Sequence, residues 1–314
     1  MDASVVICTY TEDRWDDLVA AIESVRAQEP PVADLLVVVD HAPALEARLR
    51  REYPETEDPE AEHPAMRVVP NAGGQGLSGG RNTGIAEATG DVIVFFDDDA
   101  TAGPTWVARL LAPLADPDVW VTGGLASPRF DDGRPDWFPP EFDWVVGCTY
   151  EGHPTEGELR NPIGCNMAFR RAAFDGLDGF REDMGRSGTR PLGCEETELC
   201  IRLRQADPSR RIVLAPGAPV TQRVPAQRAT VRYFLSRCYS EGLSKAQVSR
   251  LVGSDSGLAS ERAYTSRVLP QAVVRNVGES VRRRSTAGLR RSAMILAGLA
   301  STAAGYARGR LSAG

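Results

Sequence analysis

Lysine is almost absent from this chain of 314 residues, in which Lys245 is the only lysine among 36 basic residues. We interpret the excess of arginine as a composition bias and not as a code for one binding partner. The six cysteines form no CxxC pair, and several lie within apolar runs. This argues against a disulfide framework or a zinc site and predicts buried, reduced thiols in a cytosolic protein. No secretory signal is expected, because the first predicted strand, residues 4–8, starts almost at Met1.

Long apolar runs are lacking as well. A membrane-spanning helix needs about 20 apolar residues. The run at 292–307 has 16 residues without charge, contains Gly298 and Gly305, and has arginines on both sides. Its length and composition leave three interpretations open, namely a membrane span, an interfacial or re-entrant segment, and a buried core or partner helix.

Basic residues are unevenly distributed along the chain. Residues 223–314 hold 16 basic and 4 acidic residues, a formal charge of +12, whereas the remainder holds 20 basic and 39 acidic residues, a charge of −19. A cationic segment attached to an anionic body suggests an anionic partner. Phospholipid headgroups and nucleic acid both fit this charge.

The first hundred residues alternate between short apolar runs and helical periodicity. Predicted strands cover 4–8, 35–39, 67–69 and 91–96, and predicted helices cover 15–28 and 81–89. Such alternation indicates an α/β fold with parallel strands joined by crossover helices. In sheets of this kind ligands bind beyond the carboxyl ends of the strands, where Asp40 and Asp97–Asp98–Asp99 are expected.

The rest of the chain is more varied. Residues 130–150 are rich in aromatics and proline and are too irregular for one regular element, which indicates a lid or an acceptor loop. Other predicted elements are a helix at 104–114, strands at 120–122 and 212–214, an apolar segment at 163–169, a helix at 195–205, and basic amphipathic helices at 228–252 and 258–284.

Three adjacent carboxylates, Asp97, Asp98 and Asp99, follow the most hydrophobic predicted strand. In an extended segment residues i and i+2 point the same way, so Asp97 and Asp99 can address one ion. Ligation by oxygen alone suits Mg²⁺ or Mn²⁺, with a diphosphate completing the shell. The alternative is a solvated turn in which an aspartate caps the next helix.

Glycines precede the second predicted helix in the run 74–79, which matches GxGxxG. Dinucleotide binding is one interpretation, although that fingerprint normally joins the first strand of a domain to its first helix. A flexible turn is another. The interpretation we favour is a loop beside a nucleotide, with Arg81 and Asn82 as phosphate or base contacts.

Acidic residues also open the helix predicted at 195–205. Acids in a first turn complement the helix dipole, which is the structural interpretation. The functional interpretation makes one of Glu195, Glu196 and Glu198 a general base, since a sugar hydroxyl is a poor nucleophile until its proton is removed.

The order of these motifs resembles that of family 2 inverting glycosyltransferases, which have the GT-A fold. The matching pieces are Val5-Val6-Ile7-Cys8-Thr9-Tyr10, Val38-Val39-Asp40, Gly80-Arg81-Asn82-Thr83-Gly84-Ile85, Phe96-Asp97-Asp98-Asp99, Gly164-Cys165-Asn166-Met167-Ala168-Phe169 and Glu195-Glu196. Together they span about residues 4–205. The resemblance implies a GT-A catalytic domain over 1–222, with 1–99 as the nucleotide-binding half and 100–222 as the half for sugar and acceptor.

The resemblance also implies roles for individual residues. Asp97 and Asp99 correspond to the metal-binding DxD motif, with Asp98 near the ribose. Glu196 stands where the family usually has an Asp base, one methylene shorter, and Gln222 stands where it often has a metal-ligand His. The residues expected to contact the nucleotide sugar are Thr9, Tyr10, Asp40, Arg81, Asn82, Asp98 and Asn166.

Residues 223–314 form a basic helical extension expected to associate with a membrane. The run from Arg232 to Ala246 is similar to a subgroup acting on lipid-linked sugars, with glucuronosyltransferases that extend dolichyl-phosphate glucose as the nearest likeness. The processive QxxRW motif is missing, so one sugar per encounter is expected. Trp137 and Trp144 are candidates for stacking on the acceptor, with core packing as the alternative.

The predicted protein is therefore a metal-dependent, inverting glycosyltransferase on the cytoplasmic side of the cell membrane. Its donor is expected to be a nucleotide sugar, with a UDP-sugar as the favoured class. Its acceptor is expected to be lipid-linked or otherwise held near the membrane. Three rival functions remain: an inactive nucleotide-sugar-binding protein, a sugar nucleotidyltransferase and a nucleic-acid binder.

Overall fold

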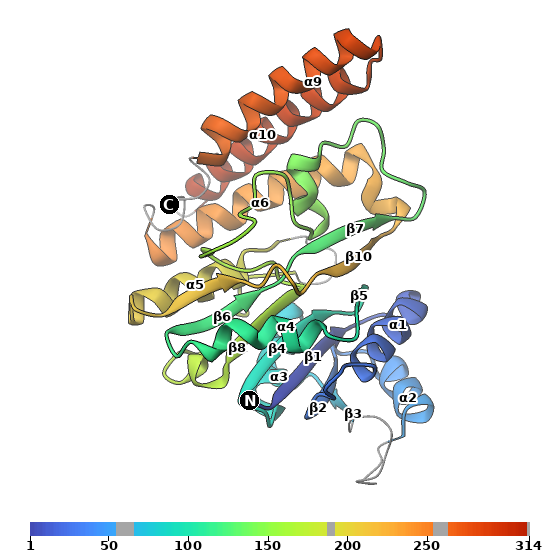
Figure 1. The fold of residues 1–314 in the computed structure, drawn as a ribbon, viewed down its shortest axis with the longest axis vertical. Helices are drawn as coiled ribbons and strands as arrows, with labels where there is room; N and C mark the ends of the chain where they lie inside the picture. Colours follow the sequence, from blue (N-terminus) through green and yellow to red (C-terminus); the bar gives the residue numbers. More distant parts are fainter. Residues whose placement is uncertain (55–65, 187–191, 254–262, 313–314) are drawn as a thin grey trace. The chain divides into compact units, whose positions relative to one another are not determined.

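The computed structural model describes residues 1–54, 66–186, 192–253 and 263–312, and the chain divides into two units (Figure 1). The first unit comprises Met1–Ser127, Pro154–Thr189 and Glu195–Gln222. The second comprises Pro128–His153, Arg190–Cys194 and Arg223–Gly314.

A seven-stranded sheet forms the centre of the first unit, in the order β3-β2-β1-β4-β8-β6-β9. Its strands are β1 (Ala3–Thr9), β2 (Asp34–Val39), β3 (Met66–Pro70), β4 (Val92–Asp97), β6 (Val119–Gly123), β8 (Asn166–Arg170) and β9 (Arg211–Leu214). The pairs among β1 to β4 are parallel, as the sequence predicts, whereas β8 is antiparallel to both β4 and β6. A smaller sheet has the order β5-β10-β7, from β5 (Ala100–Ala102), β10 (Val220–Val224) and β7 (Ala126–Phe130).

Helices cover both faces of the large sheet, because its strands are apolar on both sides. Along β4, Val94 and Phe96 pack with one set of helices, while Ile93 and Phe95 pack with the other. The first set is α1 (Trp15–Arg26), α2 (Pro43–Glu52) and α4 (Trp106–Leu111); the second is α3 (Leu77–Glu87) and α5 (Glu195–Ala206). This two-layer cover confirms the predicted α/β class.

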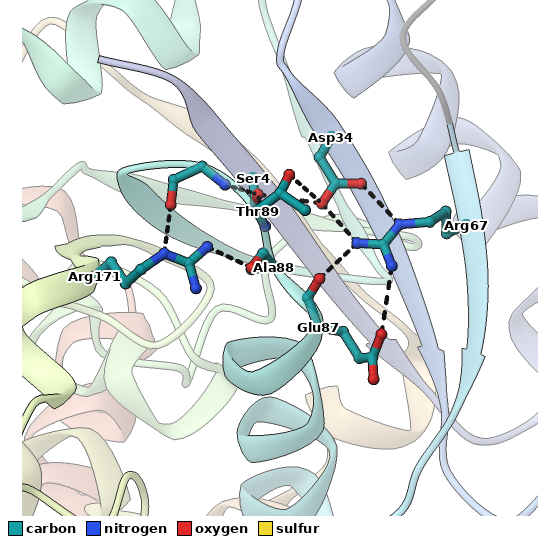
Figure 2. Close-up of polar contacts among 8 residues, drawn as sticks. Ser4, Asp34, Arg67, Glu87, Ala88, Thr89 and Arg171 are labelled. Carbon is teal, nitrogen blue, oxygen red and sulfur yellow. Dashed lines mark hydrogen bonds and ion pairs between the residues drawn. The ribbon is translucent and has the colours of Figure 1, made fainter. Parts of the chain in front are cut away.

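A polar network closes the edge of the sheet at which the parallel strands begin (Figure 2). Asp34 at the start of β2 accepts hydrogen bonds from Arg67 (2.9 and 3.2 Å) and from the Ser4 hydroxyl (3.2 Å). The same hydroxyl accepts from the backbone N–H groups of Thr89 and Gly90. The network links the end of α3 and the turn before β4 to β1, β2 and β3. It therefore fixes the positions of these elements relative to one another, on which the geometry of the opposite edge of the sheet depends.

The second unit is mainly helical, with α6 (Val231–Val252), α9 (Leu269–Arg283), α10 (Ala287–Leu311) and the 3₁₀ helix η3 (Pro140–Val146). Its core is aromatic and includes Phe138, Phe142 and Phe234, all nearly or fully buried. Two of these lie within the segment 130–150, which is therefore partly a core element and not a simple surface loop.

The charge-free run at 292–307 lies within α10, which packs along α6 and α9 (Figure 1). Gly305 allows close contact, since a Cβ there would lie 2.0 Å from the carbonyl oxygen of Tyr239 on α6. Gly298 likewise faces the rings of Phe142 and Phe234. Among the described residues, no helix has the length and apolar character required to cross a bilayer. The packing of α10 on α6 supports the interpretation of a buried core or partner helix for one face of α10, while Leu289 and Leu296 on it are exposed.

Candidate active site

Three predicted site residues lie at the carboxyl edge of the large sheet. The parallel registers pair Cys8 with Asp97 on β4 and Thr9 with Val39 on β2. Asp40 follows Val39 directly, and its backbone N–H donates to the carbonyl oxygen of Thr9 at 2.7 Å. Thr9, Asp40 and Asp97 thus share the edge at which α/β sheets of this kind bind ligands.

The Asp40 carboxylate organises the glycine-rich loop. One oxygen accepts from the Asn71 amide (2.7 Å) and the other from the backbone N–H of Gly76 (2.9 Å). The loop packs closely on α3, since a Cβ on Gly79 would lie 2.0 Å from the carbonyl oxygen of Gly74. Glu182 accepts from the Gly74 N–H at 3.0 Å. This anchoring gives Asp40 a structural role in addition to its predicted contact with the nucleotide.

The aspartate triad after β4 is paired with an arginine that sequence analysis missed. Arg14, next to α1, lies 2.9 Å from the Asp98 carboxylate and 3.1 Å from that of Asp99. Burial raises the pKa of Asp98 to about 7, even though Arg14 acts to lower it. Burial, reinforced by Asp99, also raises the pKa of Asp97. Burial thus disfavours the ionised forms of Asp97 and Asp98, and Arg14 offsets only part of this effect.

The oxygens near the triad suit a hard divalent cation. Within the described residues, the buried Oδ2 of Asp98 and the buried Oε1 of Gln222 have no hydrogen-bond partner. The amide nitrogen of Gln222 donates to Asp99, so Gln222 supports that carboxylate in this arrangement. No group of three or more His, Cys, Asp or Glu side chains converges in the described ranges. Mg²⁺ in phosphate-handling enzymes is usually held by one or two carboxylates plus substrate phosphates, and Asp97 and Asp99 stay the predicted pair of ligands.

Arg81 connects the aspartate triad to the acidic start of α5. Its side chain is only 3% exposed and lies 2.7 Å from Glu195 Oε1 and 3.9 Å from Asp97 Oδ1. A third contact runs to the carbonyl oxygen of Gly164, at 3.1 Å. Burial lowers the pKa of Arg81, but Glu195 and Asp97 more than offset this and raise it overall. One buried guanidinium thus brings a β4 carboxylate and an α5 carboxylate together.

The two candidate bases at the start of α5 differ in environment. Glu195 is buried, and its Oε2 has no hydrogen-bond partner in the part of the chain that is described. Glu196 is half-buried, and its charge contributes to raising the pKa of Arg81. Glu195 is therefore held by Arg81, while Glu196 is the more accessible carboxylate beside the same guanidinium.

Two residues that were predicted to contact the nucleotide sugar form hydrogen bonds to other parts of the protein. Asn166 is fully buried; its amide donates to the carbonyls of Leu125 (2.9 Å) and Ala218 (2.8 Å) and accepts from Trp106 Nε1 (2.9 Å). Asn82 exchanges two 2.8 Å hydrogen bonds with the backbone of Phe180. Both asparagines hold loops in place, and their contacts with the nucleotide sugar stay predictions.

The aromatic candidates lie in different surroundings. Tyr10 is 44% exposed, with the Arg14 guanidinium 5.0 Å from its ring centroid, and is accessible for stacking on a base. Trp137 and Trp144 are half-buried in the aromatic cluster of the second unit. Their neighbours include Phe234, 5.9 Å from Trp137, and Phe142, 5.4 Å from Trp144. Core packing thus accounts for both tryptophans, and their contact with an acceptor stays a prediction.

Comparison with known sequences agrees with this geometry. The sequence model described as glycosyl transferase family 2 matches residues 4–177, and the chain belongs to this family. It is 29% identical over 313 residues to the glucosyl-dolichyl phosphate glucuronosyltransferase of Haloferax volcanii, covering 99% of this chain and 97% of the relative. It is 26% identical to the succinoglycan biosynthesis protein ExoM of Rhizobium meliloti, over 86% of each chain.

Solved structures confirm the fold. The mannosyltransferase PcManGT from Pyrobaculum calidifontis, in complex with GDP-Man and Mn²⁺, has a TM-score of 0.61 at 16% identity, over 97% of this chain and 86% of that one. GalNAc-T7 with UDP, GalNAc and Mn²⁺ has a TM-score of 0.53 at 18% identity, over 78% and 51%. The predicted GT-A fold is therefore correct, and both neighbours are glycosyltransferases bound to Mn²⁺.

Proposed function

We propose that this protein transfers one sugar, with inversion, from a UDP-sugar to a lipid-linked acceptor at a membrane. The observation that carries the proposal is the buried Arg81, which contacts both Glu195 on α5 and Asp97 on β4. This contact links the carboxyl edge of the large sheet to the start of α5, where the proposed base Glu196 follows Glu195, and so supports a single displacement. Membership of family 2 and the printed activity of the Haloferax volcanii relative support the substrate classes.

Asp97 and Asp99, supported by Gln222, would hold the divalent ion. When bound, Mn²⁺ or Mg²⁺ supplies positive charge to the diphosphate leaving group. Arg14 neutralises part of the triad, and its neighbour Tyr10 offers an exposed ring for the base.

The protein residues then perform the transfer as follows. The Arg81 guanidinium holds Glu195 and adds positive charge where the diphosphate departs. Glu196 removes the proton from the acceptor hydroxyl, which attacks the anomeric carbon from the face opposite the diphosphate. The bond to the diphosphate breaks as the new glycosidic bond forms, so the anomeric configuration inverts. In this proposal, residues 1–222 form the catalytic domain that performs these steps.

The second unit is proposed to bind the anionic leaflet on the cytoplasmic side of the membrane. On α9, Val274, Val277 and Val281 follow helical spacing and are 73%, 38% and 74% exposed. The arginine run 282–284 follows directly. Apolar side chains beside arginines are typical of a helix that lies in the headgroup region, where each arginine contributes about 1 kcal/mol.

The transfer proposal is tested with purified protein, Mn²⁺ and a panel of UDP- and GDP-sugars, measuring nucleoside diphosphate release and sugar transfer to a polyprenyl-phosphate glucose. We expect Glu196→Gln to lower kcat at least about 100-fold, the minimum typical of a lost general base. Glu158→Gln, an exposed carboxylate paired with Arg211, is the matched control. Product with retained anomeric configuration, or a Glu196→Gln enzyme with normal kcat, overturns the mechanism.

The same assay separates the rival functions. A sugar nucleotidyltransferase releases pyrophosphate from a nucleoside triphosphate and a sugar phosphate. An inactive relative binds the nucleotide sugar without releasing the diphosphate. Neither result is expected here.

Membrane binding is tested by sedimentation with vesicles of phosphatidylcholine alone or mixed with phosphatidylglycerol. We expect binding only to the anionic vesicles, and a loss of roughly tenfold for each of Val274→Asn and Val281→Asn, because each valine contributes about 1.5 kcal/mol when buried. Val231→Asn, a 43% exposed valine on α6, is the control. Equal binding by all variants refutes the α9 surface, and binding to duplex DNA in preference to vesicles supports the nucleic-acid alternative.

A further inference from the structure

The two predicted metal ligands after β4 differ in how far the protein already engages them. The Asp97 side chain is 35% exposed, and its nearest printed partner, Arg81, lies 3.9 Å away. The Asp99 side chain is only 3% exposed. Its Oδ2 lies 3.1 Å from Arg14 Nη1, and its Oδ1 accepts from the amide nitrogen of Gln222. Both oxygens of Asp99 therefore accept from protein donors.

The two donors on Asp99 differ in how they respond to a cation. Gln222 carries an amide oxygen as well as an amide nitrogen, so a turn of its side chain presents an acceptor to the ion. Arg14 has no such alternative, because a guanidinium has five donors, no acceptor and a permanent positive charge. A divalent ion that binds Asp99 therefore meets a fixed like charge.

Arg14 is also held in place from other sides. The same Nη1 lies 2.9 Å from Asp98 Oδ1, and the guanidinium carbon lies 5.0 Å from the centroid of the Tyr10 ring. The Arg14 side chain is 17% exposed. Arg14 therefore stays beside the triad through Asp98 even when its contact with Asp99 is broken.

The repulsion between Arg14 and a divalent ion is offset when phosphates are present. In phosphate-handling sites Mg²⁺ is held by one or two carboxylates together with the phosphates of the substrate. The phosphates of a nucleoside diphosphate add negative charge beside both cations, whereas an ion without nucleotide has only the carboxylates that it shares with Arg14. The charge of Arg14 thus weakens the binding of the ion alone more than the binding of the ion with its nucleotide.

We propose that Arg14 competes with the divalent ion for Asp99, so that the ion binds tightly only together with a nucleoside diphosphate. This inference rests on the ion site of the proposed function. It makes Arg14 a positioning residue that acts through Asp99. By linkage, the factor by which the nucleotide tightens ion binding equals the factor by which the ion tightens nucleotide binding.

The test is titration of the whole protein with Mn²⁺, with free Mn²⁺ measured by electron paramagnetic resonance, in the absence of nucleotide and then with saturating UDP or GDP. We expect Arg14→Gln to bind Mn²⁺ alone at least about tenfold more tightly than the wild type, within the usual range of coupling between two sites. The factor by which nucleotide tightens Mn²⁺ binding should fall by the same amount. Arg14→Lys keeps the charge and should stay closer to the wild type than to Arg14→Gln.

Two further variants control for folding and for net charge. Arg14→Met is a second neutral variant and should behave as Arg14→Gln does. Arg51→Gln on α2 removes one positive charge from a side chain that is 67% exposed, and it should bind Mn²⁺ as the wild type does. Melting temperatures with and without Mn²⁺ report the same affinities in a destabilised variant, because an ion bound only by the folded protein raises the melting temperature by mass action.

The outcomes separate this inference from the proposed function. Tighter binding of Mn²⁺ alone by both neutral variants, with Arg14→Lys and Arg51→Gln near the wild type, supports the competition. Binding of Mn²⁺ alone that is no tighter in the neutral variants overturns it, while a wild type that binds Mn²⁺ with UDP or GDP keeps the ion site. Absence of Mn²⁺ binding by every variant, with and without nucleotide, overturns the ion site and this inference together.

Discussion

Replacing Arg81 by methionine tests how the candidate active site is held together. The Arg81 and Glu195 side chains are 3% and 6% exposed and lie 2.7 Å apart. Removing one partner of such a pair leaves a buried, uncompensated charge, which costs about 3–5 kcal/mol. In a protein region of 150–250 residues, 1 kcal/mol shifts Tm by roughly 2–4 °C. We therefore expect Arg81→Met to lower the Tm by about 10 °C.

A double-mutant cycle isolates the interaction itself. Arg81→Met combined with Glu195→Gln removes both charges at similar volume, so the double variant should lose at least about 2 kcal/mol less than the sum of the single variants. Urea denaturation followed by tryptophan fluorescence measures each free energy of unfolding. Additive losses, or a single variant as stable as the wild type, would show that the pair does not organise the site.

Further predictions concern other parts of the molecule. Phe234→Ala should lower the free energy of unfolding by about 3–5 kcal/mol in chemical denaturation, because this ring is fully buried in the second unit's aromatic core. Burial raises the pKa of Glu241, but Lys245 and Arg237 more than offset this and bring it to about 2. A carboxyl whose pKa is lower in the folded than in the unfolded protein stabilises the fold at pH values above its unfolded-state pKa, and this stabilisation is lost as the pH falls toward its folded-state pKa. The wild type should therefore lose roughly 3 kcal/mol of unfolding free energy from this group between about pH 4.5 and 2. Glu241→Gln should not show this loss. EDTA should abolish sugar transfer, and added Mn²⁺ should restore it, as measured by nucleoside diphosphate release.

The half of the sheet formed by β1 to β4 is the part that the sequence predicts best. The strands β1, β2 and β4 are buried on both faces, so each is an almost uninterrupted apolar run. Such runs identify the strands in the sequence without ambiguity. Because parallel strands end at one edge, the positions of Asp40 and Asp97 follow from the strand boundaries alone. Five of the six cysteines are buried, in agreement with the buried thiols predicted from their apolar surroundings, and Cys8 is half-buried.

Contacts between distant segments could not be read in the same way. Arg14 reaches Asp98 and Asp99 across more than eighty positions of sequence, and nothing in its local pattern sets it apart. Asn166 matches a family motif, yet its amide is fully engaged by backbone carbonyls and Trp106. The aromatic segment around the start of η3 has an irregular sequence because its side chains pack against α6. A repeat of apolar residues with a period of 2 or 3.6 is expected only within a regular strand or helix.

The central claim is that the carboxyl end of β4 holds a divalent ion and, through it, a nucleoside diphosphate. Calorimetric titration of UDP and GDP into wild type and Asp97→Asn, each with and without Mn²⁺, tests it most directly. We expect at least one of these nucleotides to bind the wild type only when Mn²⁺ is present, and we expect this binding to be lost in Asp97→Asn. Binding that is equally tight without Mn²⁺, or unchanged in Asp97→Asn, would contradict the account.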